Sequence, residues 1–393
     1  MTISSEEDSL GLGWTSGKIN AMQRSLLVWF QANGRHEIPW KLKSDGTKPK
    51  DGEFLNPYGI WIAEVMLQQT QLKVVCPYWE KWMESFPALS DLAIASEHKV
   101  LMQWQGLGYY SRARRILSAA KQLLETIGDA DSLDPEVWPT DLDTWMALPG
   151  IGRTTAGSIL SSAFDLPTPL LDGNVKRVLS RLVANSKPQK FFISKSWELS
   201  RQLLDRQNPR NFNQALMDLG AIVCTPHNPN CCECPWNSVC TAYSSRRIRD
   251  FPVKRSNATL PYEVIGIGIV LNIDGKVLID QRLDEGLLGG MWEFPGGKQE
   301  LGENIKETIA RELREELAIE IEVGELLISL DHLYSHKKLC FVVHLCKWIS
   351  GDPEPLESQQ CRWVKPNELN KYPFPAANLK MISALNNYLK QDK

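Results

Sequence analysis

The sequence predicts a multidomain protein in which an all-α domain is followed by a smaller α/β domain. Its 393 residues exceed the usual size of one domain, and 43% of them are hydrophobic, which is enough to build more than one core. Apolar residues recur at helical spacing from Ile19 to Ala32, and the helix-stop pair Asn33-Gly34 follows. Nearer the C-terminus, the apolar runs 264–270 and 276–280 flank an Asn-Ile-Asp-Gly turn, which predicts a hairpin of strands.

Changes in composition predict the domain boundaries. Residues 1–18 are polar and acidic, and we expect a disordered N-terminal tail. Residues 19–243 form the helical domain, residues 244–260 a basic linker that contains proline, and residues 261–393 the α/β domain. The sequence shows no 18-residue apolar run and no leader with a charged and then an apolar part. We therefore expect a cytoplasmic monomer that does not enter a membrane.

The charge of the chain is unevenly distributed. The net charge is only −3, but residues 151–260 contain 15 Lys and Arg against 7 Asp and Glu, and the parts before and after are acidic. A basic segment of this kind attracts a phosphate backbone. We therefore expect double-stranded DNA to lie against residues 151–260.

A glycine-containing turn opens this basic segment. Gly150 and Gly152 permit positive φ and close approach of another molecule, and a helix begins at Arg153, with Thr154 as its second residue. The N–H groups of such a turn and helix start can bind a phosphate without reading a base. A simple corner between two helices would have the same pattern.

Asp172 lies between two leucines and a predicted helix that contains Val175 and Val178. Its simplest role is to cap that helix. Bonds from backbone N–H groups would also keep the carboxylate ionised in a partly dry site, where it could stabilise developing positive charge. Both roles can hold at once.

Glu64 lies in a predicted helix, residues 58–71, with Gln68 one turn further along. Most helical glutamates are solvated, but Ala63 and the apolar run 65–67 leave little polar face around this one. A buried carboxyl group has a raised pKa and can act as a general acid at neutral pH.

Tyr109 lies in a Gly-Leu-Gly-Tyr-Tyr segment before an arginine-rich helix. An aromatic ring at this place could stack on bases while the arginines hold phosphates. A tyrosine of the core is the alternative.

Five of the nine cysteines fall between residues 224 and 240. The spacing of Cys224, Cys231, Cys234 and Cys240 is typical of four ligands to one metal centre, which forms more readily than disulfides in a reducing compartment. Both a zinc ion and an iron–sulfur cluster use four cysteines.

Together these motifs resemble those of the helix-hairpin-helix base-excision DNA glycosylases. Their amino-acid sequences are most similar to the MutY family of adenine glycosylases. The resemblance covers Ile19 to Cys240 and implies the all-helical glycosylase fold, with a [4Fe–4S] cluster on the four cysteines. It makes Glu64 the general acid that protonates adenine, Asp172 the carboxylate that stabilises the sugar cation, and Asn174 the residue that orients Asp172 and water.

The same resemblance implies the residues that contact DNA and the type of reaction. It makes Tyr109 a wedge beside the lesion and places Gln214 in the adenine pocket. Lyases of this superfamily, such as endonuclease III, carry a lysine directly after the hairpin arginine, where this chain has Thr154. The resemblance therefore implies removal of adenine opposite 8-oxoguanine or guanine without strand cleavage; an endonuclease III-like lyase is the alternative.

The α/β domain contains a nearly complete Nudix box from Gly297 to Ile319. Glu312, Glu315 and Glu316 lie at i, i+3 and i+4, so their carboxylates share one helical face that can hold Mg²⁺ against a diphosphate. A solvated helix with pairs such as Arg311 and Glu315 would show the same spacing.

Two further segments of this domain resemble readers of an oxidised base. Residues 374–378 resemble 8-oxo-dGTP hydrolases of the MutT type, in which the asparagine matching Asn378 reads the base. Residues 334–336 resemble the loop by which adenine glycosylases read 8-oxoguanine, and this places Ser335 on the lesion.

We therefore expect the second domain to read the lesion. Hydrolysis of 8-oxo-dGTP with Mg²⁺ is an additional activity to consider, although Ala318 replaces the final glycine of the box and Arg362 replaces a further glutamate. A phosphohydrolase of the nucleotide pool that merely carries a DNA-binding domain is the rival from another class.

Overall fold

The chain divides into two compact units in the computed structural model. The first comprises residues 1–94 and 118–256, and the second comprises residues 95–117 and 257–393. The second unit thus includes a segment that the order of the sequence assigns to the helical domain. No described helix is both long and apolar enough to cross a membrane. The structure describes residues 14–128, 134–253, 260–286, 288–334 and 337–391.

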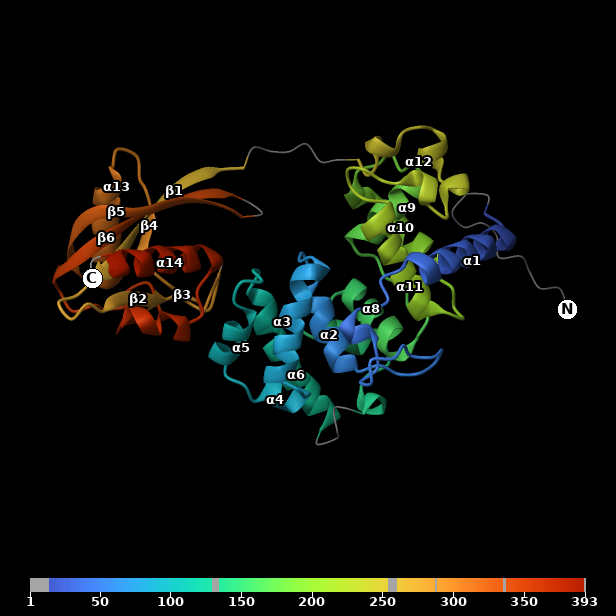
Figure 1. The fold of residues 1–393 in the computed structure, drawn as a ribbon, viewed down its shortest axis with the longest axis horizontal. Coiled ribbons are helices and arrows are strands. Elements are labelled where there is room, and N and C mark those ends of the chain that lie inside the picture. The colour runs from blue at the N-terminus through green and yellow to red at the C-terminus, as the bar shows by residue number, and fades with distance from the viewer. Residues whose placement is uncertain (1–13, 129–133, 254–259, 287, 335–336, 392–393) are drawn as a thin grey trace. The chain divides into compact units, whose positions relative to one another are not determined.

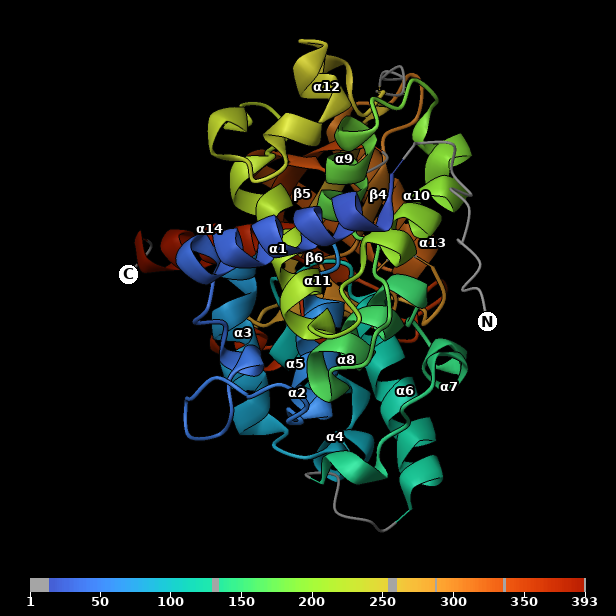
Figure 2. The same cartoon turned by 90° about the vertical axis from the view of Figure 1, so that its right-hand side faces the viewer.

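The first unit is all-helical, as predicted (Figure 1). Its helices pack around a core that includes Leu26, Leu171, Phe212 and Trp236. Helix α2 packs on α8, and α1 lies across α11 (Figure 2). The α-helices that belong wholly or largely to this unit are α1 (Ser16–Asn33), α2 (Pro57–Met66), α3 (Leu72–Ser85), α4 (Leu89–Ala93), α6 (Ser111–Ile127), α7 (Leu142–Ala147), α8 (Arg153–Phe164), α9 (Gly173–Leu182), α10 (Gln189–Leu203), α11 (Pro209–Asp218) and α12 (Thr241–Ser244).

The helical unit begins earlier than the sequence suggests. Helix α1 starts at Ser16, because the Thr15 hydroxyl caps it by accepting a 3.3 Å hydrogen bond from the Lys18 N–H. Trp14 is buried on the helical core. The expected tail is therefore corrected for residues 14–18, and residues 1–13 lie outside the described residues.

The unit also continues into the expected linker. A one-turn helix spans Ile248–Asp250, and the Phe251 side chain after it is buried. The Phe251 carbonyl accepts a 3.0 Å hydrogen bond from Nε of Arg181. Residues 244–251 are therefore an ordered part of the helical unit, and their basic composition reflects exposed arginines on its surface.

One predicted helix is shorter in the structure. Helix α2 ends at Met66 instead of continuing to residue 71, because Gln69 adopts a φ of 61° that no α-helix can contain. Gln68 consequently lies in the turn that follows α2, and not on the helical face of Glu64.

The second unit is built on one seven-stranded sheet (Figure 1). The central order is β3-β2-β1-β6-β5, with β4 paired to β1 and β7 paired to β2. Strands β1 and β6 are parallel, and the other pairs are antiparallel. The strands are β1 (Tyr262–Leu271), β2 (Val277–Gln281), β3 (Trp292–Glu293), β4 (Gly296–Lys298), β5 (Glu320–Leu333), β6 (Lys338–Ser350) and β7 (Gln360–Val364).

Two helices cover opposite faces of this sheet, which makes the second unit α/β as predicted. Helix α13 (Ile305–Leu317) buries Ile309 and Leu313 against one face. Helix α14 (Ala376–Gln391) buries Met381 and Leu385 against the other. The unit also contains α5 (Glu97–Trp104) and the first turns of α6.

Candidate active site and cysteine loop

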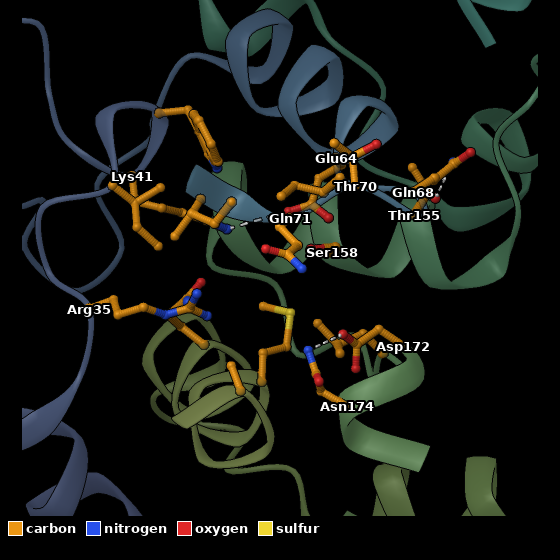
Figure 3. Close-up of a pocket in the computed structure, with 18 of the residues that line it drawn as sticks. Arg35, Lys41, Glu64, Gln68, Thr70, Gln71, Thr155, Ser158, Asp172 and Asn174 are labelled. Carbon is orange, nitrogen blue, oxygen red and sulfur yellow. Dashed lines mark hydrogen bonds and ion pairs between the residues drawn. The ribbon is translucent and has the colours of Figure 1, made fainter. Parts of the chain in front are cut away.

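A cavity of about 720 Å³ opens in the helical unit (Figure 3). Its walls come from α2, from the starts of α8 and α9, from α11, and from the segment that follows α1. The lining includes most of the residues predicted for the site and some that were not predicted. They are Arg35, Lys41, Glu64, Gln68, Gln71, Thr154, Thr155, Ser158, Asp172, Asn174 and Gln214.

Glu64 projects into this cavity from α2, a helix whose other residues are buried. Only 12% of the Glu64 side chain is exposed. Burial raises the pKa of Glu64, and the nearby charge of Asp172 raises it further, while the ammonium group of Lys41 lowers it. The carboxyl group can therefore keep its proton at a higher pH than a solvated glutamate, as a general acid requires.

Asp172 caps α9, as predicted. Its Oδ1 accepts a 2.7 Å hydrogen bond from the Val175 N–H, and its Oδ2 accepts one of 3.2 Å from the Asn174 amide (Figure 3). We expected these bonds to keep the carboxylate ionised. They do lower its pKa, but burial outweighs them and the pKa of Asp172 is raised. A positive charge developing in the cavity would favour the ionised form.

The hairpin before α8 is joined to both carboxylate-bearing segments. Gly150 has a φ of 80°, as its predicted turn requires, and Gly152 is the N-cap of α8. The Gln68 amide donates to the Gly150 carbonyl (3.4 Å) and to the Thr155 hydroxyl (3.2 Å). The Thr154 hydroxyl donates to the Leu171 carbonyl, the residue before Asp172 (3.1 Å). Gln68 and Thr154 thus hold the hairpin against the site.

Lys41 is the main site residue that the sequence analysis missed. Its Nζ lies 3.7 Å from Oε1 of Glu64, and only 13% of its side chain is exposed. The amine also donates a hydrogen bond to the Ser162 hydroxyl. In the sequence, Lys41 begins a polar Lys- and Gly-rich stretch that looks like a surface loop, so no local signal marks it as buried.

Gln214 is buried in α11, at the edge of the cavity. Its amide donates to Oδ1 of Asp218 (2.8 Å). The Arg35 guanidinium donates to the same oxygen, with Nη2 at 2.6 Å and Nε at 2.9 Å. This network fixes the orientation of the Gln214 amide and adds Arg35 and Asp218 to the residues that shape the pocket.

Tyr109 lies in the second unit, and 43% of it is exposed. Its φ of 47° is unusual for a residue with a side chain. Arg112 is buried and donates to the carbonyls of Leu107 (3.3 Å) and Gly108 (3.0 Å), and its guanidinium lies over the Tyr109 ring. The expectation that the arginines here hold phosphates is therefore wrong for Arg112, which supports the turn that presents Tyr109.

The four predicted ligand cysteines border one small internal space. Among the described residues, no three Cys, His, Asp or Glu side chains converge as a single metal ion would require. A four-iron cluster places its own irons and sulfides between the thiolates, so its ligands surround a space and need not meet at a point. The four thiols border one common space, as the ligands of one such centre do.

Two arginines of α9 bind this cysteine loop, and one of them also binds a residue that lines the cavity. Arg177 donates to the Cys224 carbonyl (2.8 Å) and to Oδ1 of Asn174 (2.9 Å). Arg181 is almost fully buried and donates to the carbonyls of Thr225 (2.7 Å) and Pro226 (3.1 Å). One helix therefore carries the Asp172 cap at its start and the support of the cysteine loop further along.

The Nudix box forms the predicted strand–helix segment of the second unit. A Cβ at Gly297 would meet the carboxyl end of the Glu312 side chain, which lies directly against this glycine. Arg311 binds Glu303 (2.6 Å), Glu312 (2.9 Å) and Glu315 (2.9 Å), so these three carboxylates share one guanidinium, which offsets only part of their negative charge. Ala318 has a φ of 56°, the conformation that the glycine of a complete box would adopt more easily.

Glu316 faces a separate acidic pocket of about 200 Å³. Asp280 and Glu293 line the same pocket, and Oδ1 of Asp280 is buried without a hydrogen-bond partner. Burial, followed by the charges of Glu293 and Glu312, raises the pKa of Glu316 to about 8. The predicted set of Glu312, Glu315 and Glu316 is thus divided between an ion-pair network and this pocket.

The structure describes only one of the two residues that were predicted to read the oxidised base. Asn378 is buried at the start of α14, and its Oδ1 accepts a 3.1 Å hydrogen bond from the Phe294 N–H. This bond ties it to the segment between β3 and β4. Ser335 lies outside the described residues.

Comparisons with known proteins match both units. Residues 62–201 match the model of the HhH-GPD superfamily of base excision DNA repair proteins, and residues 266–384 match the NUDIX domain. The adenine DNA glycosylase of Rattus norvegicus is 33% identical and covers 88% of this chain and 74% of its own length. The enzymes of Mus musculus (35% identical; 83% and 70%) and Homo sapiens (32% identical; 90% and 72%) align in the same way.

The relatives align with most of the chain, and the glycosylase match covers the end of α2, the hairpin and α9, which carry Glu64, Thr154 and Asp172. The chain belongs to the adenine DNA glycosylase family of helix-hairpin-helix base excision repair proteins, and it carries a C-terminal Nudix domain.

Proposed function

We propose that the helical unit excises adenine from DNA by hydrolysing its N-glycosidic bond. The observation that carries the proposal is the meeting of Glu64 and Asp172 in one cavity, beside a hairpin whose N–H groups can bind a phosphate. The substrate is adenine paired with 8-oxoguanine or guanine in double-stranded DNA, and the enzyme acts as a cytoplasmic monomer.

The two carboxyl groups have different tasks in this reaction. Glu64, whose pKa is raised by burial, donates its proton to N7 of the flipped adenine and makes the base a better leaving group. As the glycosidic bond breaks, positive charge develops on the sugar, and the Asp172 carboxylate stabilises it. Asn174, hydrogen-bonded to Oδ2 of Asp172, orients this carboxylate and the water that adds to the sugar.

The hairpin position favours base removal without strand cleavage. Thr154 occupies the place at which lyases of this superfamily carry a lysine, and its hydroxyl is bound to the Leu171 carbonyl. Tyr109, exposed and held in an unusual backbone conformation, is the proposed wedge, and the Gln214 amide is the proposed contact with adenine.

The excision chemistry can be tested with a matched pair of variants. In single-turnover assays on a duplex with one adenine opposite 8-oxoguanine, Glu64→Gln should lower the rate constant by about 10³-fold or more, because the general acid is lost. DNA affinity should stay within a few-fold, since Glu64 contacts no phosphate in this mechanism. Glu37→Gln, a change at an exposed glutamate before the site, is the control. Excision by Glu64→Gln near the parent rate would contradict the mechanism.

The cysteine loop is proposed to hold a [4Fe–4S] cluster on Cys224, Cys231, Cys234 and Cys240. Bound there, the cluster would stabilise this loop, and with it the basic segment 246–249 that follows it, for binding to DNA. The support is the arrangement of the four thiols around one space and the buried Arg181 that holds the loop carbonyls. The purified protein should be brown and contain about four iron and four sulfide per chain, whereas stoichiometric zinc without iron would contradict the cluster.

The second unit is proposed to read 8-oxoguanine opposite the adenine, with Ser335 and Asn378 as the contacts. A second candidate function, hydrolysis of 8-oxo-dGTP with Mg²⁺, is favoured by one observation. Asp280 lines the pocket that Glu316 shares and has a buried carboxyl oxygen without a hydrogen-bond partner, which is an environment that a cation would stabilise.

The two functions of the second unit can be separated by incubating the full chain with 8-oxo-dGTP and Mg²⁺. Release of the monophosphate and pyrophosphate that disappears in Glu316→Gln would establish the hydrolase. No turnover above buffer, together with weaker discrimination of 8-oxoguanine from guanine in Asn378→Ala, would leave lesion reading as the function of this unit.

A further inference from the structure

The candidate active site contains a primary amine that the excision mechanism does not use. Nζ of Lys41 lies 3.7 Å from Oε1 of Glu64, inside the cavity that would receive the flipped nucleotide. Figure 3 shows the Lys41 side chain extending into this space from the segment before α2. Among the described residues that line this cavity, the other lysine is Lys73, an exposed residue on α3.

The surroundings of this amine favour its neutral, nucleophilic form. Burial lowers the pKa of Lys41, and the charge of Arg210 adds to this effect. Glu64 and Asp218 act in the opposite direction, but the pKa remains below its ordinary value. Buried lysines of this kind act as nucleophiles toward carbonyl groups. The Glu64 carboxylate, once it has given its proton to the base, can also accept the proton of the Lys41 ammonium group.

We propose that Lys41 captures the abasic product as a reversible imine. This inference rests on the proposed excision function, because the product of that reaction is a sugar whose open-chain form has an aldehyde at C1′. The Lys41 amine attacks this carbonyl carbon, the carbon–oxygen double bond is replaced by a carbon–nitrogen double bond, and the oxygen leaves as water with both amine hydrogens. No oxidant or reductant takes part.

The position of Lys41 relative to Glu64 makes this capture possible after, but not before, excision. Glu64 protonates the base, so the amine 3.7 Å away lies next to the space that adenine occupies. Departure of adenine empties this space and exposes C1′, and the flexible lysine stem can then advance toward it. Thr154, at the hairpin position, has no amine with which to make the same bond.

Imine formation would retain the abasic site without breaking the strand. Strand cleavage would need a further elimination of the 3′-phosphate, which is not part of the proposal. The expected consequence is slow release of the product, because the imine must be hydrolysed before the abasic DNA can leave.

The test is reductive trapping with borohydride, which converts an imine into a stable covalent link. The full-length protein is mixed with a duplex that already contains an abasic site opposite 8-oxoguanine, so that trapping does not depend on excision. We expect a covalent protein–DNA product and, after digestion, a sugar adduct on the peptide that contains Lys41. An adduct on another lysine, or no adduct, would overturn the proposal.

Two variants complete the test. Lys41→Arg keeps a cation beside Glu64 but lacks a nucleophilic amine, and it should reduce trapping at least tenfold. Its fold is checked by circular dichroism and by binding to the same duplex; trapping at the parent level in folded Lys41→Arg would overturn the proposal. Lys73→Arg should retain trapping.

A parallel assay on adenine opposite 8-oxoguanine separates the two proposals. Excision without trapping would reject the imine and keep the glycosylase. Trapping at Lys41 on the abasic duplex without adenine excision would reject the proposed glycosylase and keep the reactive lysine.

Discussion

At the scale of single residues, the site depends on a balance of charges around Glu64. Burial raises the pKa of this group, and the neighbouring Asp172 raises it further, whereas Lys41 lowers it. A buried carboxyl group next to an amine destabilises the fold unless the charges of the two groups compensate each other. The same balance sets the pH at which Glu64 loses its proton and can no longer act as a general acid.

This balance predicts a shift in the pH dependence of excision. The single-turnover rate constant should fall as pH rises and Glu64 loses its proton. Lys41→Met removes the group that lowers the pKa of Glu64, so the fall should move to higher pH. The measurement is a pH–rate profile of the parent and of the variant. A fall that moves to lower pH, or that does not move, would show that Lys41 does not set the protonation of Glu64.

At the scale of elements, α9 links the two halves of the candidate site. Its N-cap is Asp172, and its buried Arg181 holds several carbonyls of the cysteine loop and its continuation. A helix with both tasks must be placed accurately, because a shift at either end displaces groups at the other.

Loss of the Arg181 guanidinium should therefore destabilise the helical unit. Arg181→Met leaves the buried Phe251 carbonyl and the partly buried carbonyls of Cys224 and Thr225 without this donor, at about 1–3 kcal/mol for each one that stays unsatisfied. We expect the free energy of unfolding to fall by about 3 kcal/mol or more, measured by urea titration with tryptophan fluorescence. Arg201→Met, at an exposed position of α10, is the control and should change it by less than about 0.5 kcal/mol. Equal effects of the two changes would contradict the assigned role.

Helix α13 makes a second prediction at this scale. The pKa of Glu316 is raised from 4.5 to about 8, so its protonated form stabilises the fold. This contribution is complete below pH 4.5 and is lost as pH rises to about 8. Glu316→Gln cannot ionise, so it avoids this loss of stability and should raise the unfolding midpoint of the second unit at alkaline pH, by roughly 2–4 °C per kcal/mol gained.

The control for Glu316→Gln is Glu354→Gln, at an exposed position of the same unit. It should leave the difference in midpoint between acid and alkaline pH unchanged. If Glu316→Gln is no more stable than the parent at alkaline pH, a bound cation already compensates the buried carboxylate, and added chelator should then restore the difference.

At the scale of the whole molecule, the distribution of charge separates the surface that would bind DNA from the rest. Residues 151–260 carry 15 basic against 7 acidic side chains, and the sequence on both sides is acidic. Because phosphate contacts release counterions, affinity for DNA should fall at least tenfold between about 50 and 200 mM salt.

The uneven charge also predicts which residues cause the salt dependence of DNA affinity. Arg246→Glu and Arg249→Glu, both at exposed positions beyond α12, should each reduce the slope of log affinity against log salt by about 1. Lys81→Glu, exposed on α3 in the acidic part of the chain, should leave the slope unchanged. A uniform effect of all three changes would show that the basic segment has no special role.

The sequence by itself determined the features that depend on local spacing. Helical periodicity predicted α1 and α8, the Asp172 cap predicted the start of α9, and the Asn-Ile-Asp-Gly turn predicted the hairpin of β1 and β2. The spacing of the cysteines singled out four thiols that border one space, and the apolar neighbours of Glu64 indicated its burial. Each of these signals lies within a few turns or strands of the residues it describes.

Only the tertiary structure decided which distant groups meet. Lys41 pairs with Glu64 because a polar segment folds over α2, and Arg181 supports a loop more than 40 residues further along the chain. The ends of the helical unit also differ from the prediction, since Trp14 and Phe251 are buried by packing that composition does not reveal. The sequence analysis did not predict the edge strand β5, although residues 320–323 alternate polar and apolar, as a strand with one face in water does. Burial and electrostatic coupling between segments far apart in sequence are properties of the folded chain, and local patterns cannot encode them.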